Sequence, residues 1–114
     1  MLAVLEKDYV GRHASGVNGG GVRTLGRDFA EVPLALASRE IWLDIESLLG
    51  DDCGFRKSGQ IKIAETAAEL EKLSERCRAL NAMGFAHERL IGATELRDWV
   101  PGLADHCNGG ILVE

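Results

Sequence analysis

The chain has 114 residues, a net charge of −5 and 46% hydrophobic residues. This length suits one domain with a buried core, and the acidic balance disfavours nucleic acid or an anionic membrane surface as a partner. No apolar run approaches the roughly 20 residues that cross a bilayer, and the first residues lack the basic and apolar regions of a secretion signal. We therefore expect a cytoplasmic protein with no membrane-spanning segment.

The cysteines and histidines show no metal-binding pattern. Cys53, Cys77 and Cys107 are widely spaced, without a CxxC pair and without histidines at zinc-ligand spacing. We expect reduced thiols and no metal site. Cys77 lies on the apolar stripe of an expected helix, which favours a position in the core.

The N-terminal part combines a short apolar run with a glycine-rich stretch. Residues 2–5 are continuously apolar, which predicts a buried strand of a parallel sheet that ends at Glu6. Residues 8–29 predict a long loop with room for one helical turn, and such loops are usually functional or disordered. A carboxylate at a strand end can bind a ribose, and a glycine-rich loop lets backbone N–H groups approach a pyrophosphate or a flavin ring. The pattern is typical of the second half of a dinucleotide site.

Two long amphipathic helices are expected downstream. Apolar residues recur at helical spacing between residues 33 and 49, and Gly50 follows as a C-cap. Thr66 and Glu69 form a capping box before the second helix, which Gly84 ends.

Shorter elements surround the second helix. Residues 55–64 predict an extended segment with Gly59 at a bend and with Ile61 and Ile63 on one buried face. Residues 85–91 fit either a short strand or an irregular connection. Thr94 predicts the N-cap of a short helix that ends before Pro101.

The last residues predict a turn at Asn108, Gly109 and Gly110, and then a strand that is just beginning at residues 111–113. With the run at residues 2–5, this would place both termini within strands, which is unusual for a self-contained domain.

Five sequence motifs occur in a recognisable order: VLEK at 4–7, GRHASGVNGGGVR at 11–23, FRKSGQIKIAET at 55–66, WVPGL at 99–103 and GGILVE at 109–114. With the helices between them, these motifs resemble the D-amino-acid oxidase family of FAD-dependent oxidoreductases. Sarcosine oxidases, glycine oxidases and related amine or imino-acid dehydrogenases belong to that family. The resemblance spans essentially the whole chain.

The resemblance implies an α/β (α+β) fold class with two partial regions. Residues 1–50 would form part of a Rossmann-like FAD-binding domain, with its second strand, glycine-rich flavin loop and long helix. Residues 51–114 would form part of a substrate domain, with the start of a mixed or antiparallel sheet.

The resemblance also implies a set of residues that contact FAD: Glu6, Lys7, Ser15, Asn18, Gly19, Gly20, Gly21, Val22 and Arg23. Glu6 would bind the ribose hydroxyls and Lys7 would lie near the adenine. Ser15 would donate to a phosphate, and Asn18 and residues 19–22 would line the cofactor. Arg23 would lie near the isoalloxazine ring, where a cation stabilises negative charge on the reduced flavin.

The residues alone also fit simpler interpretations: a strand-end carboxylate at Glu6, a flexible loop at the glycines and a surface charge at Arg23. They predict no catalytic residue. A P-loop is excluded, because no GK[ST] follows the glycines. Binding of a simple phosphate ligand by the glycine loop alone is therefore disfavoured.

In the family fold, a GxGxxG turn precedes the ribose-binding acid by about 20 residues or more, whereas only five residues precede Glu6. We therefore expect an internal part of an enzyme that oxidises a small amine or amino acid (sarcosine, glycine, D-amino acid or proline type) at its C–N bond. We expect it to be inactive alone and not to hold FAD stably. The alternative is a non-catalytic interaction module derived from such an enzyme, and exposed strand edges would favour self-association.

Overall fold

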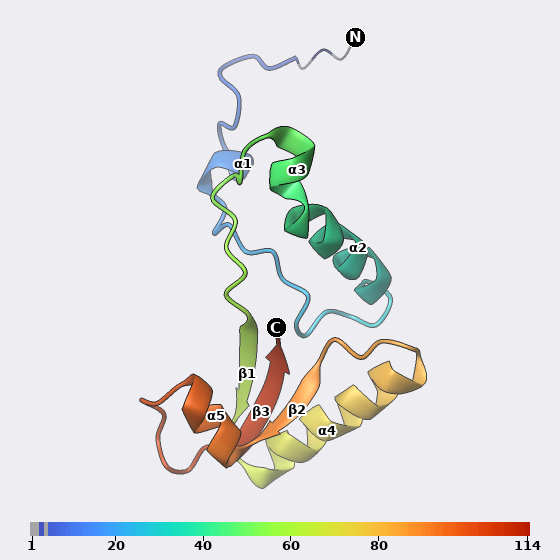
Figure 1. Cartoon of the computed structure of the whole chain (residues 1–114), viewed down its shortest axis with the longest axis vertical. Coiled ribbons are helices and arrows are strands. Elements are labelled where there is room, and N and C mark those ends of the chain that lie inside the picture. Colours follow the sequence, from blue (N-terminus) through green and yellow to red (C-terminus); the bar gives the residue numbers. More distant parts are fainter. Residues whose placement is uncertain (1–2, 4) are drawn as a thin grey trace.

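The computed structural model describes residue 3 and residues 5–114. Its elements in chain order are α1 (Ala14–Val17), α2 (Val32–Leu43), α3 (Ile45–Leu49), β1 (Gln60–Ala64), α4 (Ala67–Ala82), β2 (Arg89–Gly92), α5 (Ala93–Trp99) and β3 (Gly109–Val113). Figure 1 shows the sheet with α4 and α5 at one end of an elongated molecule and α2 and α3 nearer the other end. The predicted mixed α/β class is confirmed.

The strand expected over residues 2–5 lies partly outside the described residues. Leu2 and Val4 lie outside the described residues, while Ala3, Leu5 and Glu6 adopt no strand conformation, and Leu5 is exposed. The expected helical turn in the following loop is confirmed as α1.

The sheet is antiparallel, with strand order β1-β3-β2. Leu112 of β3 lies opposite Ile61 of β1 and Arg89 of β2. The last strand is thus central, and all five of its residues are buried. The predicted turn at Gly109 and Gly110 is wrong, because both glycines already belong to the strand and pair on both sides.

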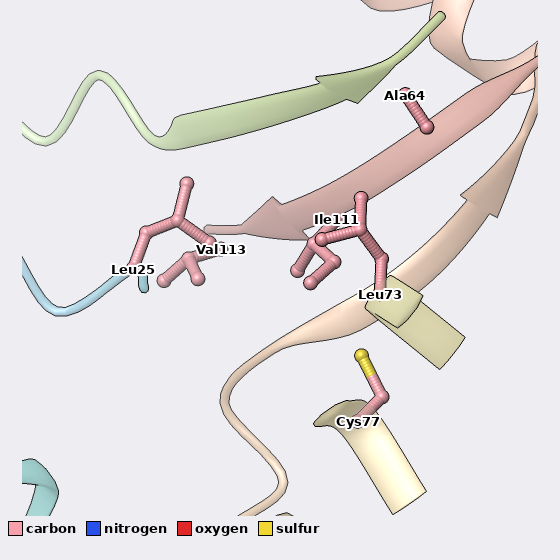
Figure 2. Packing of buried hydrophobic residues seen from close by; sticks show 6 residues of the cluster. All are labelled: Leu25, Ala64, Leu73, Cys77, Ile111 and Val113. Carbon is pink, nitrogen blue, oxygen red and sulfur yellow. The ribbon is translucent and has the colours of Figure 1, made fainter. Parts of the chain in front are cut away.

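The two faces of the sheet carry separate cores, because side chains alternate along a strand. One core joins the α4 face of the sheet to the loop before α2, and Figure 2 shows its members: Leu25, Ala64, Leu73, Cys77, Ile111 and Val113. The other core lies under α5 and contains Ile91, Leu96, Cys107 and Leu112. The predicted core position of Cys77 is confirmed.

The expected buried face of the 55–64 segment needs correction. Ile61 packs against the core under α5, but Ile63 is 38% exposed. Ala64, which points to the opposite face, is fully buried instead. The bend at Gly59 is confirmed by its φ of 73°.

Local chemistry accounts for the helix ends. Thr66 Oγ1 accepts the N–H of Glu69, and the Glu69 carboxylate accepts the N–H of Thr66, so the predicted capping box is confirmed. Gly50 and Gly84 follow their helices with φ of 71° and 87°, as helix-ending glycines do.

Two helix boundaries differ from expectation. The helix expected over residues 33–49 is divided into α2 and α3 at Asp44, whose φ of −105° and ψ of 15° leave the helical region. Aspartate competes for backbone hydrogen bonds and favours helix ends over interiors. Helix α5 begins at Ala93 with Gly92 as its N-cap, so the predicted cap at Thr94 is wrong by two residues. Within the described part of the chain, no helix is long and apolar enough to span a membrane.

We expect Gly110→Ala to lower the free energy of unfolding by about 3 kcal/mol. A Cβ there would overlap the Lys62 carbonyl oxygen of β1, so the paired strands would have to move apart. Urea unfolding measures the effect. Gly102→Ala is the control because its Cβ would meet nothing within 4 Å, and equal losses in both variants would contradict the explanation.

Candidate cofactor-binding site

The glycine-rich segment, residues 18–27, connects α1 to the turn before α2. In Figure 1 it runs from α1 to the start of β1 and the end of β3. At its beginning the Asn18 side-chain oxygen accepts the N–H of Gly20 at 2.7 Å. Gly20 has a φ of 66°, a conformation that glycine adopts without steric cost. The sequence NGG therefore sets a tight turn at the start of the segment.

A first cavity of about 500 Å³ lies between the glycine-rich segment and α2. Its lining includes Asn18, Gly20, Gly21, Val22 and Arg23 from the segment. From the helix, Leu34 and Trp42 add apolar surface and Ser38 adds a hydroxyl. Five of the nine expected cofactor contacts thus share one hollow.

A second cavity of about 180 Å³ also includes Gly20, Gly21 and Val22 in its lining. It extends over residues 54–60 and includes the cationic side chains of Arg39 and Lys57. Gly20, Gly21 and Val22 thus line both the first and the second cavity.

The backbone of the segment offers hydrogen-bond donors at this place. Among the described residues, no hydrogen bond occupies the N–H groups of Gly21 and Val22. A Cβ at Gly20 or Gly21 would meet nothing within 4 Å, so there is open space beside the backbone. A planar or anionic ligand can therefore approach these donors closely.

Gln60, the first residue of β1, anchors the middle of the segment. Its Oε1 accepts the N–H groups of Thr24 at 3.1 Å and Leu25 at 3.0 Å, and its Nε2 donates to the Val22 carbonyl at 3.3 Å. Thr24 and Leu25 are buried, so these donors have exchanged water for one amide side chain.

A buried ion pair anchors the end of the segment. Glu88 Oε1 accepts the N–H of Gly26 at 2.8 Å, and both carboxylate oxygens accept from Arg76, at 2.7 and 2.9 Å. Arg76 also donates to the Arg27 carbonyl at 2.8 Å. Burial alone would raise the pKa of Glu88, but the hydrogen bonds from Arg76 and Gly26 and the Arg76 charge together lower it.

Sequence reasoning did not select these anchors. Arg76 lies on α4 among the residues of its buried apolar stripe, which are Leu73, Cys77 and Leu80. A cationic residue within an apolar stripe indicates a buried anionic partner, because a buried charge is rarely left unpaired. Nothing comparable distinguishes Gln60 or Glu88 in the sequence.

The remaining expected contacts lie elsewhere. The Glu6 carboxylate accepts the N–H groups of Lys7 and Asp8, at 2.8 and 3.2 Å, and neither Glu6 nor Lys7 lines a cavity described above. Gly19 is exposed beside the first cavity. The backbone of Ser15 lies in α1, while its side chain lies outside the described residues. The cofactor roles of all nine expected residues stay predictions.

A family model described as FAD dependent oxidoreductase matches residues 2–114. The chain belongs to this family. No curated protein and no solved structure matches it. Membership confirms the family that the motifs resemble, while the sarcosine or glycine oxidase subfamily and the division at residue 50 stay predictions. Among the described residues of this family member, no three His, Cys, Asp or Glu side chains group as a metal site.

We expect Gln60→Ala to lower the free energy of unfolding by about 2 kcal/mol, because it leaves two buried N–H groups without an acceptor. Chemical denaturation measures the loss, and the amide signals of Thr24 and Leu25 should shift. Lys62→Ala, on the same strand but exposed, should change stability little. Unchanged Thr24 and Leu25 signals would show that Gln60 does not hold the segment.

We also expect stability to fall as the pH is lowered through the ordinary histidine pKa of about 6.5. The His87 side chain is 10% exposed, and among the described residues no hydrogen bond reaches either ring nitrogen. Burial lowers its pKa and the charges of Arg76 and Arg39 lower it further, against the opposing effects of Glu88 and of the Thr24 backbone. The unfolded chain therefore binds more protons than the folded chain below this pH, so acid favours unfolding.

Urea unfolding at several pH values between about 7.5 and 5.5 tests this range. His87→Gln, which cannot titrate, should make the stability curve flatter there. If the variant and the natural chain lose stability in parallel, another group is responsible. Glu88, whose pKa is also lowered, should add its own loss only in more acidic solution, because its stabilising charge is lost below the ordinary glutamate range.

Proposed function

We propose that this chain supplies the flavin-contacting segment of an enzyme that uses FAD to oxidise the C–N bond of a small amine or amino acid. The candidate substrates are of the sarcosine, glycine, D-amino acid or proline type. One observation carries the proposal: five residues of the segment line a cavity of about 500 Å³ in a member of an FAD-dependent family.

The residues of the first cavity fit a flavin. Gly21 and Val22 offer backbone N–H donors without side-chain obstruction at the glycine. Trp42 and Leu34 offer apolar surface on the opposite wall. Ligand sites of this kind combine apolar walls with a few convergent polar groups. The chemistry that FAD supplies when bound is acceptance of a hydride equivalent from the carbon that bears the nitrogen.

Each residue of the segment has a distinct part in the proposal. The N–H groups of Gly21 and Val22 donate to polar atoms of the cofactor. The Arg23 cation stabilises negative charge that develops on the reduced ring system. Trp42 and Leu34 supply apolar surface against which the ring system can pack.

The nucleotide end of the cofactor requires the other expected contacts. We propose that Glu6 accepts hydrogen bonds from the ribose, that Lys7 lies near the adenine, and that Ser15 donates to a phosphate. The support is the family membership together with the carboxylate chemistry of Glu6. We further propose that the chain alone contacts FAD only weakly and does not turn over substrate, because a single segment supplies the described contacts.

The test is FAD titration of the isotopically labelled chain, followed by NMR. We expect the amide signals of Gly20, Gly21 and Val22 and the indole N–H signal of Trp42 to shift, because all four residues line the first cavity. The indole signal of Trp99, on α5, should not shift. The protein should be colourless after desalting and should not oxidise sarcosine, proline or D-alanine with an artificial electron acceptor.

A pair of arginine variants sharpens the test. Arg23→Ala should weaken FAD binding about tenfold, equivalent to about 1.4 kcal/mol. Arg78→Ala, on the exposed side of α4, should leave it unchanged. Shifts confined to other surfaces, or equal effects of both variants, would contradict the flavin contact. A yellow, active preparation would contradict the proposed need for further parts of the enzyme.

A further inference from the structure

Glu88 is a fully buried carboxylate directly beneath the glycine-rich segment. Its side chain is 0% exposed, and the side chain of its partner Arg76 is 19% exposed. Removing two such charges from water costs free energy, and their mutual attraction compensates for this cost only when the geometry is good. Apolar side chains of similar size at such positions often give an equally stable protein. The pair therefore calls for an explanation other than stability alone.

The clamp, defined as Arg76 with Glu88, directs its remaining hydrogen bonds to the segment. Glu88 accepts the N–H of Gly26, and Arg76 donates to the carbonyl of the next residue, Arg27. The Arg76 guanidinium also lies over the Phe29 ring, 5.1 Å from its centroid. Three positions just after Arg23 are thus tied to α4 and to the residue that precedes β2.

The clamp lies outside the ligand space itself. Neither Arg76 nor Glu88 lines the first or the second cavity. The clamp instead bonds to the backbone of Gly26 and of Arg27, and Arg27 lines the first cavity together with Arg23. Gln60 fixes Val22, Thr24 and Leu25 from the other side.

We propose that Arg76 and Glu88 are positioning residues for the cofactor. Together with Gln60 they hold residues 22–27 in place before a ligand arrives, so that the Val22 N–H and the Arg23 cation already border the first cavity. Binding then does not have to order a glycine-rich chain, which would otherwise weaken affinity. The inference rests on the proposed function for its ligand, but the position of the segment can be measured without one.

The decisive variant is the double substitution Arg76→Met with Glu88→Leu. It replaces the ion pair by apolar side chains of similar size, so the sheet and α4 should remain folded while every hydrogen bond from the clamp to the segment is lost. The matched control is Arg78→Met with Glu71→Leu, which removes an exposed ion pair from the same helix.

We expect the β3 amide signals and the unfolding midpoint of the double variant to stay close to those of the natural chain. The Gly26 amide should exchange with solvent at least about tenfold faster, because local opening is easier once its acceptor is gone. The signals of Val22 and Arg23 should move, and FAD binding should weaken about tenfold through the added ordering cost. The control pair should show none of these changes.

Glu88→Gln provides a rescue test and a second route if the double variant does not fold. It retains a side-chain oxygen that can accept the Gly26 N–H, so Gly26 exchange should rise less than in Glu88→Leu. Unchanged Val22 and Arg23 signals in folded clamp variants would overturn the inference, as would altered signals with unchanged FAD affinity. If the amide signals of the natural chain do not shift when FAD is added, the proposed function is contradicted. The Val22 and Arg23 signals measured without FAD still decide whether the clamp positions the segment.

Discussion

The position of the glycine-rich segment depends on hydrogen bonds from the sheet to its backbone. A segment with so many glycines has little side-chain surface to bury, so apolar packing alone cannot fix it. Leu25 is its single residue in the hydrophobic core, where it lies beside Val113 (Figure 2). The amide of Gln60 and the carboxylate of Glu88 supply the remaining attachment by accepting three consecutive backbone N–H groups, those of residues 24–26.

These anchors come from both outer parts of the sheet. Gln60 begins β1, and Glu88 immediately precedes β2, while the buried strand β3 lies between them. The distance between the two anchors is therefore set by strand pairing across β3. That pairing depends on Gly109 and Gly110, where a Cβ would overlap carbonyl oxygens of the neighbouring strands. The sheet and the glycine-rich segment are therefore connected by direct hydrogen bonds, and a shift in strand pairing would also move the segment.

The sequence predicted what adjacent residues determine. The capping box joins Thr66 and Glu69, which are three positions apart, and the helix-ending glycines likewise affect only the adjacent helix turn. The apolar stripe of α4, which includes Cys77, follows the helical period. The anchors were missed because they join residues 36 and 62 positions apart, and a single sequence carries no signal of such pairing. The division at Asp44 was missed for a different reason, since the apolar periodicity continues through it.

The two halves of the expected FAD contact are specified by different kinds of interaction. Residues 22–27, which include the expected contacts Val22 and Arg23, are attached to the sheet by polar anchors and by Leu25. Among the described residues, the hydrogen bonds and ion pairs of Glu6, Asp8 and Arg12 remain within that stretch of chain. Glu6 closes a local turn with one carboxylate oxygen, Oε1, which accepts the Lys7 and Asp8 N–H groups. Its other oxygen, Oε2, is left to accept a ribose hydroxyl. In the proposed site, residues 22–27 are thus held by the sheet without a ligand. The stretch around Glu6 would have to be fixed relative to the sheet when a ribose binds, at a cost in affinity.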